Sequence, residues 1–247
     1  MPYENLNKLW PAEAPNRSDI PIVGDEIRHN GLLLEANGIE VVFNNFEDRL
    51  VEMISQSKAV IGCVAWLTNE SILEALALCP ETAIVVQKED LWRPDIDSHK
   101  RSDWKQHLAD LYRQIEDRNL GWIIRVGRTL SVCGSCDGGG IRCMGNYNST
   151  RKAAFPRMHH KFALFGDIVE HKADHKSSEF VPHTLWTGSY NWTVNAGHSL
   201  ENALIVDAKT HPVIIDAFYN EFIHIFSLSE PLDFESNWVA PEWRIGT

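Results

Sequence analysis

The stretch Met158-His159-His160-Lys161-Phe162-Ala163-Leu164-Phe165-Gly166-Asp167 decides both the fold and the chemistry expected of this chain. Its apolar run predicts a buried strand over 160–165. Because strand residues alternate between two faces, His159 and Lys161 are expected on one face and His160 on the other, where it packs. An imidazole beside an ammonium suits phosphoryl chemistry, since the ring can attack phosphorus while the cation neutralises charge on the phosphate oxygens. The stretch therefore points to a phosphohistidine intermediate.

A second group of polar residues follows downstream in Thr187-Gly188-Ser189-Tyr190-Asn191-Trp192. This segment predicts a strand that ends in a tight turn, where a hydroxyl, an amide and free backbone N–H groups can bind phosphate. The later carboxylate of Glu201 can fix the tautomer and orientation of a histidine. For Tyr190 and Trp192, core packing is the favoured interpretation, and stacking on a nucleic-acid base is the alternative.

On both sides of these motifs, apolar periodicity predicts strands and helices in alternation. The expected strands cover 39–43, 59–67, 82–87, 122–126, 160–165, 184–187 and 203–206. Helices are expected from Phe46 after Asn44-Asn45, from a cap at Asn69 to Leu78, from near Ser102, and from Pro212. This order predicts an α/β fold with a mixed central sheet and helices on both of its faces.

One domain is expected over residues 39–247, after an N-terminal extension at 1–38. Two polar insertions, at about 128–157 and 168–183, are expected to border the site. No apolar run approaches the ~20 residues that a membrane span requires, and the N-terminus lacks the features of a secretory signal. We therefore expect a cytoplasmic protein with no membrane partner.

The formal charge of −11 argues against long-range attraction of nucleic acid, but the charge is unevenly distributed. The stretch 121–161 has a net charge of +6, so the rest of the chain has −17. Arg151, Lys152 and Arg157 lead directly into the histidine motif and are candidate substrate-binding residues. A solvated basic loop is the alternative interpretation.

Five cysteines are present. Three of them, Cys133, Cys136 and Cys143, form a C-x2-C-x6-C pattern in a glycine-rich segment, which suits a structural zinc ion if a fourth ligand joins them. The sequence identifies no fourth ligand, and unligated thiols in a loop are the alternative. No cofactor is expected for catalysis.

Together these motifs resemble the phospholipase D superfamily, whose signature is H-x-K-x4-D followed by G-S-x-N and then an acidic residue near an asparagine. Here they read His159-x-Lys161, Gly188-Ser189-x-Asn191 and Glu201-Asn202. The similarity covers about residues 39–226. Because the histidine motif occurs once, the chain looks most like the single-motif branch, which includes bacterial Nuc nucleases and the Zucchini or mitochondrial cardiolipin hydrolase group.

That resemblance implies a homodimer with a shared active site. His159 of one subunit would be the nucleophile and His159 of the other would protonate the leaving oxygen. Lys161 and Asn191 would hold the phosphate, Ser189 would assist, and Glu201 would steady the imidazole. No metal enters chemistry of this kind.

The chain departs from the signature at one position, because Gly166 stands where the superfamily has aspartate. Asp167 follows one residue late, and in a strand such a slip reverses the face on which the side chain lies. A turn beginning at Gly166 would restore its direction. Asp167 is accordingly a supporting candidate rather than a central one.

Three functions remain open at this point. The first is a metal-independent nuclease that cleaves DNA or RNA. The second has the same mechanism and acts on phospholipid headgroups. The third is a catalytically silent dimeric module in a larger assembly, for which a partner ATPase or effector of a defence system is one analogy.

Overall fold

The computed structural model of the chain describes residues 32–34, 37–88, 103–116, 124–126, 130–132, 140–145, 157–170 and 178–232. Within these residues a nine-stranded mixed sheet has the order β1-β2-β10-β9-β8-β3-β4-β7-β11. Its strands are β1 (Leu32–Leu34), β2 (Ile39–Val42), β3 (Ala59–Val64), β4 (Glu81–Gln87), β7 (Ile141–Met144), β8 (Lys161–Glu170), β9 (Ser178–Gly188), β10 (Ala203–Asp207) and β11 (Glu230–Pro231). Strands β3, β4 and β7 are mutually parallel, and the other pairings are antiparallel.

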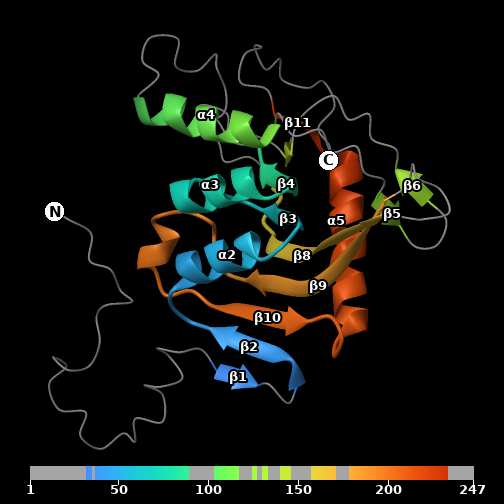
Figure 1. Ribbon diagram of the computed structural model, residues 1–247. Coiled ribbons are helices and arrows are strands. Elements are labelled where there is room, and N and C mark those ends of the chain that lie inside the picture. The colour runs from blue at the N-terminus through green and yellow to red at the C-terminus, as the bar shows by residue number, and fades with distance from the viewer. Residues whose placement is uncertain are drawn as a thin grey trace, which may run out of the picture.

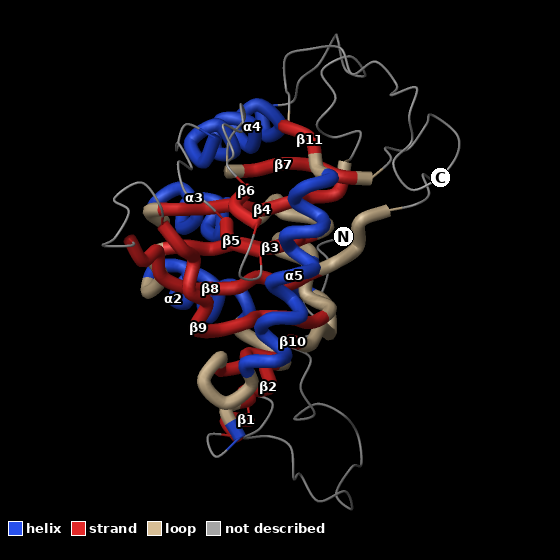
Figure 2. The backbone as a smooth tube through the Cα atoms, turned by 90° about the vertical axis from the view of Figure 1, so that its right-hand side faces the viewer, coloured by secondary structure: helices blue, strands red, loops and turns tan. Residues whose placement is uncertain are grey.

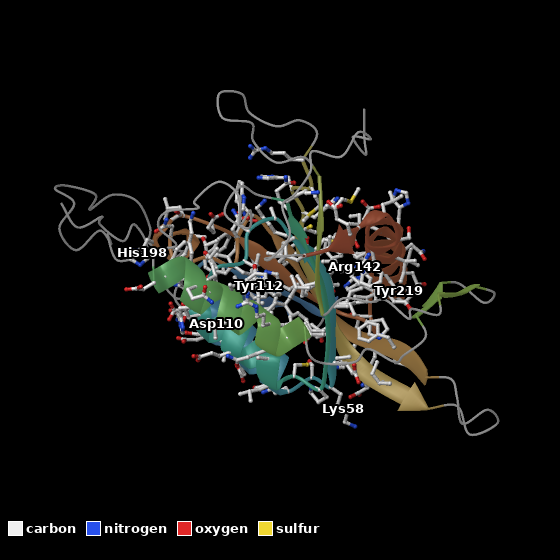
Figure 3. All side chains as sticks on the ribbon, turned by 90° about the horizontal axis from the view of Figure 1, so that it is seen from above. Lys58, Asp110, Tyr112, Arg142, His198 and Tyr219 are labelled. Carbon is white, nitrogen blue, oxygen red and sulfur yellow. The ribbon has the colours of Figure 1, made fainter. Side chains whose placement is uncertain are left out.

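Helices cover both faces of this sheet, which confirms the predicted α/β class (Figure 1). One face carries α2 (Phe46–Ser55), α3 (Glu70–Leu78) and α4 (Asp103–Glu116). On the other face α5 (Pro212–Leu228) runs across the strands (Figure 2). Figure 3 shows Tyr112 of α4 and Tyr219 of α5 on opposite sides of the sheet.

The buried residues form two clusters, one under each helical layer, because the sheet separates them. In β8 the side chains alternate between these clusters. Ala163 and Phe165 pack with the layer of α2, α3 and α4, whereas Phe162 and Leu164 pack with α5. All six residues of β3 are buried, as expected for a strand covered on both faces.

Local signals placed several element ends correctly. The side chain of Asn69 accepts a hydrogen bond from the backbone N–H of Ile72 (3.1 Å), so it caps α3 as predicted. Pro212 begins α5. Asn45 occupies the N-cap position of α2, but it has a left-handed backbone (φ 53°) and its side chain makes no capping bond.

The two predicted insertions are wrong in part. Residues 141–144, inside the expected 128–157 insertion, form β7 and pair in parallel with β4. The strand expected at 122–126 is β5 (Ile124–Val126), which pairs with β6 (Leu130–Val132) in a separate ribbon. In the second insertion, 168–170 and 178–183 belong to the long strands β8 and β9.

β1 pairs with β2, so the sheet begins within the segment expected to be an extension. Among the residues that the structure describes, no helix has the length and apolar character needed to cross a membrane.

The contact between β3 and β8 gives a stability prediction. A Cβ at Gly62 would lie 2.4 Å from the carbonyl oxygen of Phe162 and 2.8 Å from Cα of Ala163, so Gly62→Ala would force two central strands apart. We expect a loss of about 1–3 kcal/mol in the free energy of unfolding, measured by urea denaturation. In the control Gly197→Ala the nearest atom is 4.0 Å away, so its stability should stay close to wild type. Equal midpoints for the two variants would contradict this packing.

Candidate functional site

Four strand ends meet at one edge of the sheet, drawn at the left in Figure 1. Val64 at the end of β3 lies opposite Lys161 at the start of β8. Gly188 at the end of β9 lies opposite Ala203 at the start of β10. Because the motif residues follow or precede these ends directly, the fold gathers the predicted catalytic groups in one place.

Lys161 and His159 form the centre of the site. The Lys161 ammonium lies 3.2 Å and 3.3 Å from the two ring nitrogens of His159 and donates to its backbone carbonyl oxygen at 2.9 Å. Lys161 is only 8% exposed, whereas His159 is exposed. The ammonium is therefore held in a buried position by the backbone of His159, and the imidazole remains accessible to solvent.

Both groups have lowered pKa values. Partial burial and then the positive charges of Lys161 and Arg157 lower the pKa of His159, with a smaller contribution from His160. Burial also lowers the pKa of Lys161, although the carboxylate of Glu201 opposes that shift. A depressed pKa keeps the imidazole neutral over a wider pH range, which is the form that can act as a nucleophile.

Three hydrogen bonds hold the Gly188-Ser189 turn against the residues that lead into β10. Ser189 accepts a hydrogen bond from the Asn202 N–H at 3.0 Å, and its own N–H donates to the Asn202 carbonyl at 2.9 Å. The Ser189 hydroxyl donates to the carboxylate of Glu201 in a short hydrogen bond. A Cβ at Gly188 would lie 2.1 Å from the Asn202 carbonyl oxygen, which explains the glycine of this motif.

Glu201 therefore has a different partner from the predicted one. Among the described residues its carboxylate accepts from Ser189 and acts electrostatically on Lys161, and no hydrogen bond joins it to His159. Asn191 lies on the same turn and is half-buried, with its side-chain oxygen buried and without a hydrogen-bond partner in the described structure.

The aromatic neighbours of Asn191 belong to the core. Tyr190 and Trp192 are fully buried, so the core-packing interpretation is confirmed and neither ring is available to stack on a base. Tyr190 stacks on Phe46 of α2 with ring centroids 4.6 Å apart. These two residues are thus corrected from substrate binders to supports of the turn.

Asp167 is also placed away from the site. β8 continues without a turn through Gly166 to Glu170, so the expected turn is wrong. Asp167 lies six residues beyond Lys161, about 20 Å along an extended strand, and its carboxylate is 4.0 Å from the ammonium of Lys58. A Cβ at Gly166 would lie 2.3 Å from the Val181 carbonyl oxygen, so packing against β9 accounts for glycine at this position.

The expected insertion at 168–183 does not border the catalytic edge either. Its described residues, 168–170 and 178–183, lie at the far ends of β8 and β9, whereas the histidine motif lies at the opposite ends of these strands. His160 lies on the α5 side of the sheet, on the face opposite to His159 as predicted, but the expectation that it packs is wrong. It is exposed and lies 3.2 Å from the Glu221 carboxylate of α5.

The remaining predicted ligands are mostly outside the described residues. Arg151, Lys152, Cys133 and Cys136 fall there, so the structural zinc site and substrate binding by Arg151 and Lys152 remain predictions. Cys143 is buried in the core on β7, and burial raises its pKa to about 12, which disfavours the thiolate that zinc needs. Within the described part of the chain no group of three or more His, Cys, Asp or Glu residues could hold a metal ion.

Two residues of the site were not predicted. The indole of Trp66 meets the ring of His159 edge to face, with centroids 5.2 Å apart. The side-chain oxygen of buried Gln87 accepts from the Met158 N–H at 2.7 Å, which fixes the backbone directly before His159. Trp66 lies near the end of the predicted strand 59–67 and Gln87 ends the predicted strand 82–87, and positions at strand ends were the available signal.

Comparison with known proteins shows a relative in a giant virus. The chain is 30% identical over 207 residues to the uncharacterized protein L381 of Acanthamoeba polyphaga mimivirus, and the match covers 81% of this chain and 69% of that protein. A comparison with protein-family models finds no match.

Two solved structures are similar at low sequence identity. Nuc from Salmonella typhimurium, described as a phospholipase D family member, has a TM-score of 0.44 and 14% identity, over 78% of this chain and 95% of that one. NucT from Helicobacter pylori has a TM-score of 0.44 and 12% identity, over 78% of this chain and 98% of that one.

The charge of Lys161 gives a prediction for the site. Lys161→Met keeps the apolar stem and removes the ammonium, so the pKa of His159 should rise relative to wild type. An NMR titration of the His159 ring measures this change. The matched control is Lys58→Met, because that lysine is 72% exposed at the other end of β3 and should leave the titration unchanged. An identical His159 midpoint in wild type and Lys161→Met would refute the coupling.

Proposed function

The chain belongs to the same family as the mimivirus protein L381, and from the geometry of its histidine site we propose that it is a phosphodiesterase of the phospholipase D superfamily. The observation that carries this proposal is the buried Lys161 ammonium held against an exposed, neutral-prone His159. Asn191 lies at the same sheet edge, and its side-chain amide N–H groups can donate hydrogen bonds to a phosphate. The proposed substrate is DNA or RNA, with no metal cofactor in the reaction.

The proposed reaction has two steps. A ring nitrogen of His159 attacks the phosphorus, so a P–N bond forms, the P–O bond to the leaving group breaks, and the leaving oxygen takes a proton from a second imidazole. Water then attacks the phosphorus and gives its proton to that second imidazole, and the P–N bond breaks. Lys161 stabilises the negative charge on the non-bridging oxygens throughout.

The second imidazole is the reason for proposing a homodimer. Among the described residues, the other histidine beside the nucleophile is His160, and it lies on the opposite face near Glu221. A two-fold axis through the site would bring in His159 of a second copy as the proton donor. Val194 and Leu200, 52% and 58% exposed on the loop that carries Asn191 and Glu201, offer apolar surface for this contact.

Nucleic acid is the favoured substrate because of the charge around the histidine. Arg157, one of the three predicted substrate-binding cations, is close enough to His159 for its charge to lower the pKa of the imidazole. Its positive charge would attract a polyanion. Glycine in place of the superfamily aspartate no longer supports the hypothesis of a catalytically silent module, because packing against β9 explains Gly166.

A cleavage assay in EDTA tests the proposed activity. The wild type should cut at least one of single- and double-stranded DNA and RNA, and His159→Ala should lose at least about 10³-fold in rate, because the nucleophile is removed. His160→Ala is the matched control and should stay within a few fold of wild type. Equal background rates for wild type and His159→Ala would refute the proposal, and headgroup release from liposomes in place of cleavage would shift the substrate to phospholipid.

The shared site has its own test. The wild-type protein should have the native mass of a dimer in solution, because each site needs two copies of His159. Leu200→Glu, which places a carboxylate on the proposed contact surface, should lower both the dimer fraction and the activity. A fully active monomer would contradict the shared site.

A further inference from the structure

The orientation of the His159 ring needs an explanation, because the predicted carboxylate does not provide it. Glu201 accepts from Ser189 in the described structure. The neighbouring His160 is turned toward Glu221. Within the described part of the chain, the ring of His159 contacts Lys161 and Trp66.

Trp66 contacts both members of the catalytic pair. Its indole meets the His159 ring at an interplanar angle of 82°. The Lys161 ammonium lies over the same indole, 5.6 Å from the ring centroid, within the range of a cation–π interaction. One rigid aromatic side chain therefore constrains the nucleophile and the cation together.

Three backbone hydrogen bonds hold the segment that contains Ala65 and Trp66. Its carbonyl oxygen accepts from the Trp192 N–H at 3.0 Å, which ties it to the Asn191 turn. The N–H of Ala65 donates to the His160 carbonyl at 2.8 Å, and the Ala65 carbonyl accepts from the Gln87 N–H at 3.1 Å. Because these bonds connect the segment to both β8 and β4, the indole has a fixed base from which to orient its neighbours.

We propose that Trp66 is the positioning residue of the active site, holding the imidazole of His159 and the ammonium of Lys161 in the relative geometry that phosphoryl transfer needs. This inference rests on the proposed phosphodiesterase function. In this scheme Trp66 acts through His159 and Lys161. Burial lowers the pKa of His159, and the indole of Trp66 is one of the groups that meet its ring.

The expected kinetic effect is on turnover rather than on binding. Trp66→Leu removes the aromatic contact, and a displacement of the imidazole by about 1 Å is enough to lower kcat on the order of 10²-fold. KM should change little, because the phosphate-binding groups remain. Trp66→Phe keeps an aromatic ring at this position and should retain kcat within several fold of wild type.

The experiment combines kinetics with a readout that needs no activity. Full-length wild type, Trp66→Leu and Trp66→Phe are assayed on the best nucleic-acid substrate, and the His159 ring is followed by NMR across pH. In Trp66→Leu the ring resonances should lose the shift imposed by the indole and the pKa of His159 should rise, whereas Trp66→Phe should stay close to wild type. Trp104→Leu, at an exposed tryptophan of α4, is the matched control and should change neither readout.

The outcomes separate the two proposals. If folded Trp66→Leu keeps the wild-type kcat, or raises KM while kcat is unchanged, Trp66 is not a positioning residue. If the wild type cleaves no substrate, the proposed function fails and the NMR titration alone decides. In that case an unchanged His159 spectrum in Trp66→Leu overturns the inference, and an altered spectrum with Trp66→Phe rescue supports it. Thermal unfolding of each variant shows that the comparison is made between folded proteins.

Discussion

The antiparallel ladder between β3 and β8 is the constraint on which the site depends. Its register runs from Ala59 opposite Gly166 to Val64 opposite Lys161. This pairing puts the end of β3 and the start of β8 at the same edge, so the residues just beyond them, Trp66 and His159, come into contact. A shift of one residue would reverse the faces of Lys161 and every later side chain of β8. The close approach of the two backbones at Gly62 fixes the distance between the strands.

The electrostatics of the site follow from where this ladder ends. Lys161 is drawn into a largely buried position, which costs free energy for an ammonium unless a carboxylate is near. Glu201 supplies that charge and is itself held by the Ser189 hydroxyl. Ser189 and Glu201 therefore stabilise the charged form of Lys161. The positive charge of Lys161 in turn favours the neutral form of His159. The turn at Ser189 therefore affects His159 indirectly, through Glu201 and Lys161.

Sequence patterns predicted the structural features that depend on residues close together in the chain. The strand at His159-x-Lys161, the Asn69 cap and the start of α5 at Pro212 each depend on a few neighbouring residues, and the mixed α/β class follows from their alternation. The parallel pairing of β7 with β4 depends instead on contacts distant in the chain, and four residues in a glycine-rich segment carry too weak a pattern to show it. The same holds for the Ser189–Glu201 pair, because which donor reaches a carboxylate is decided by strand register rather than by spacing.

The turn after β9 shows how one short motif serves both packing and chemistry. Its alternate residues Ser189 and Asn191 are half-buried at the site, whereas Tyr190 and Trp192 are fully buried in the core. The stack of Tyr190 on Phe46 and the backbone bonds of Trp192 to Trp66, Thr68 and Asn69 anchor the turn to α2 and to the segment that enters α3. A phosphate-binding turn must hold its donors in place against the reaction, and buried aromatic side chains provide that rigidity without occupying the site. The aromatic residues next to the motif therefore act by fixing Ser189 and Asn191, while Trp66, which borders the site itself, is the aromatic residue in contact with the catalytic pair.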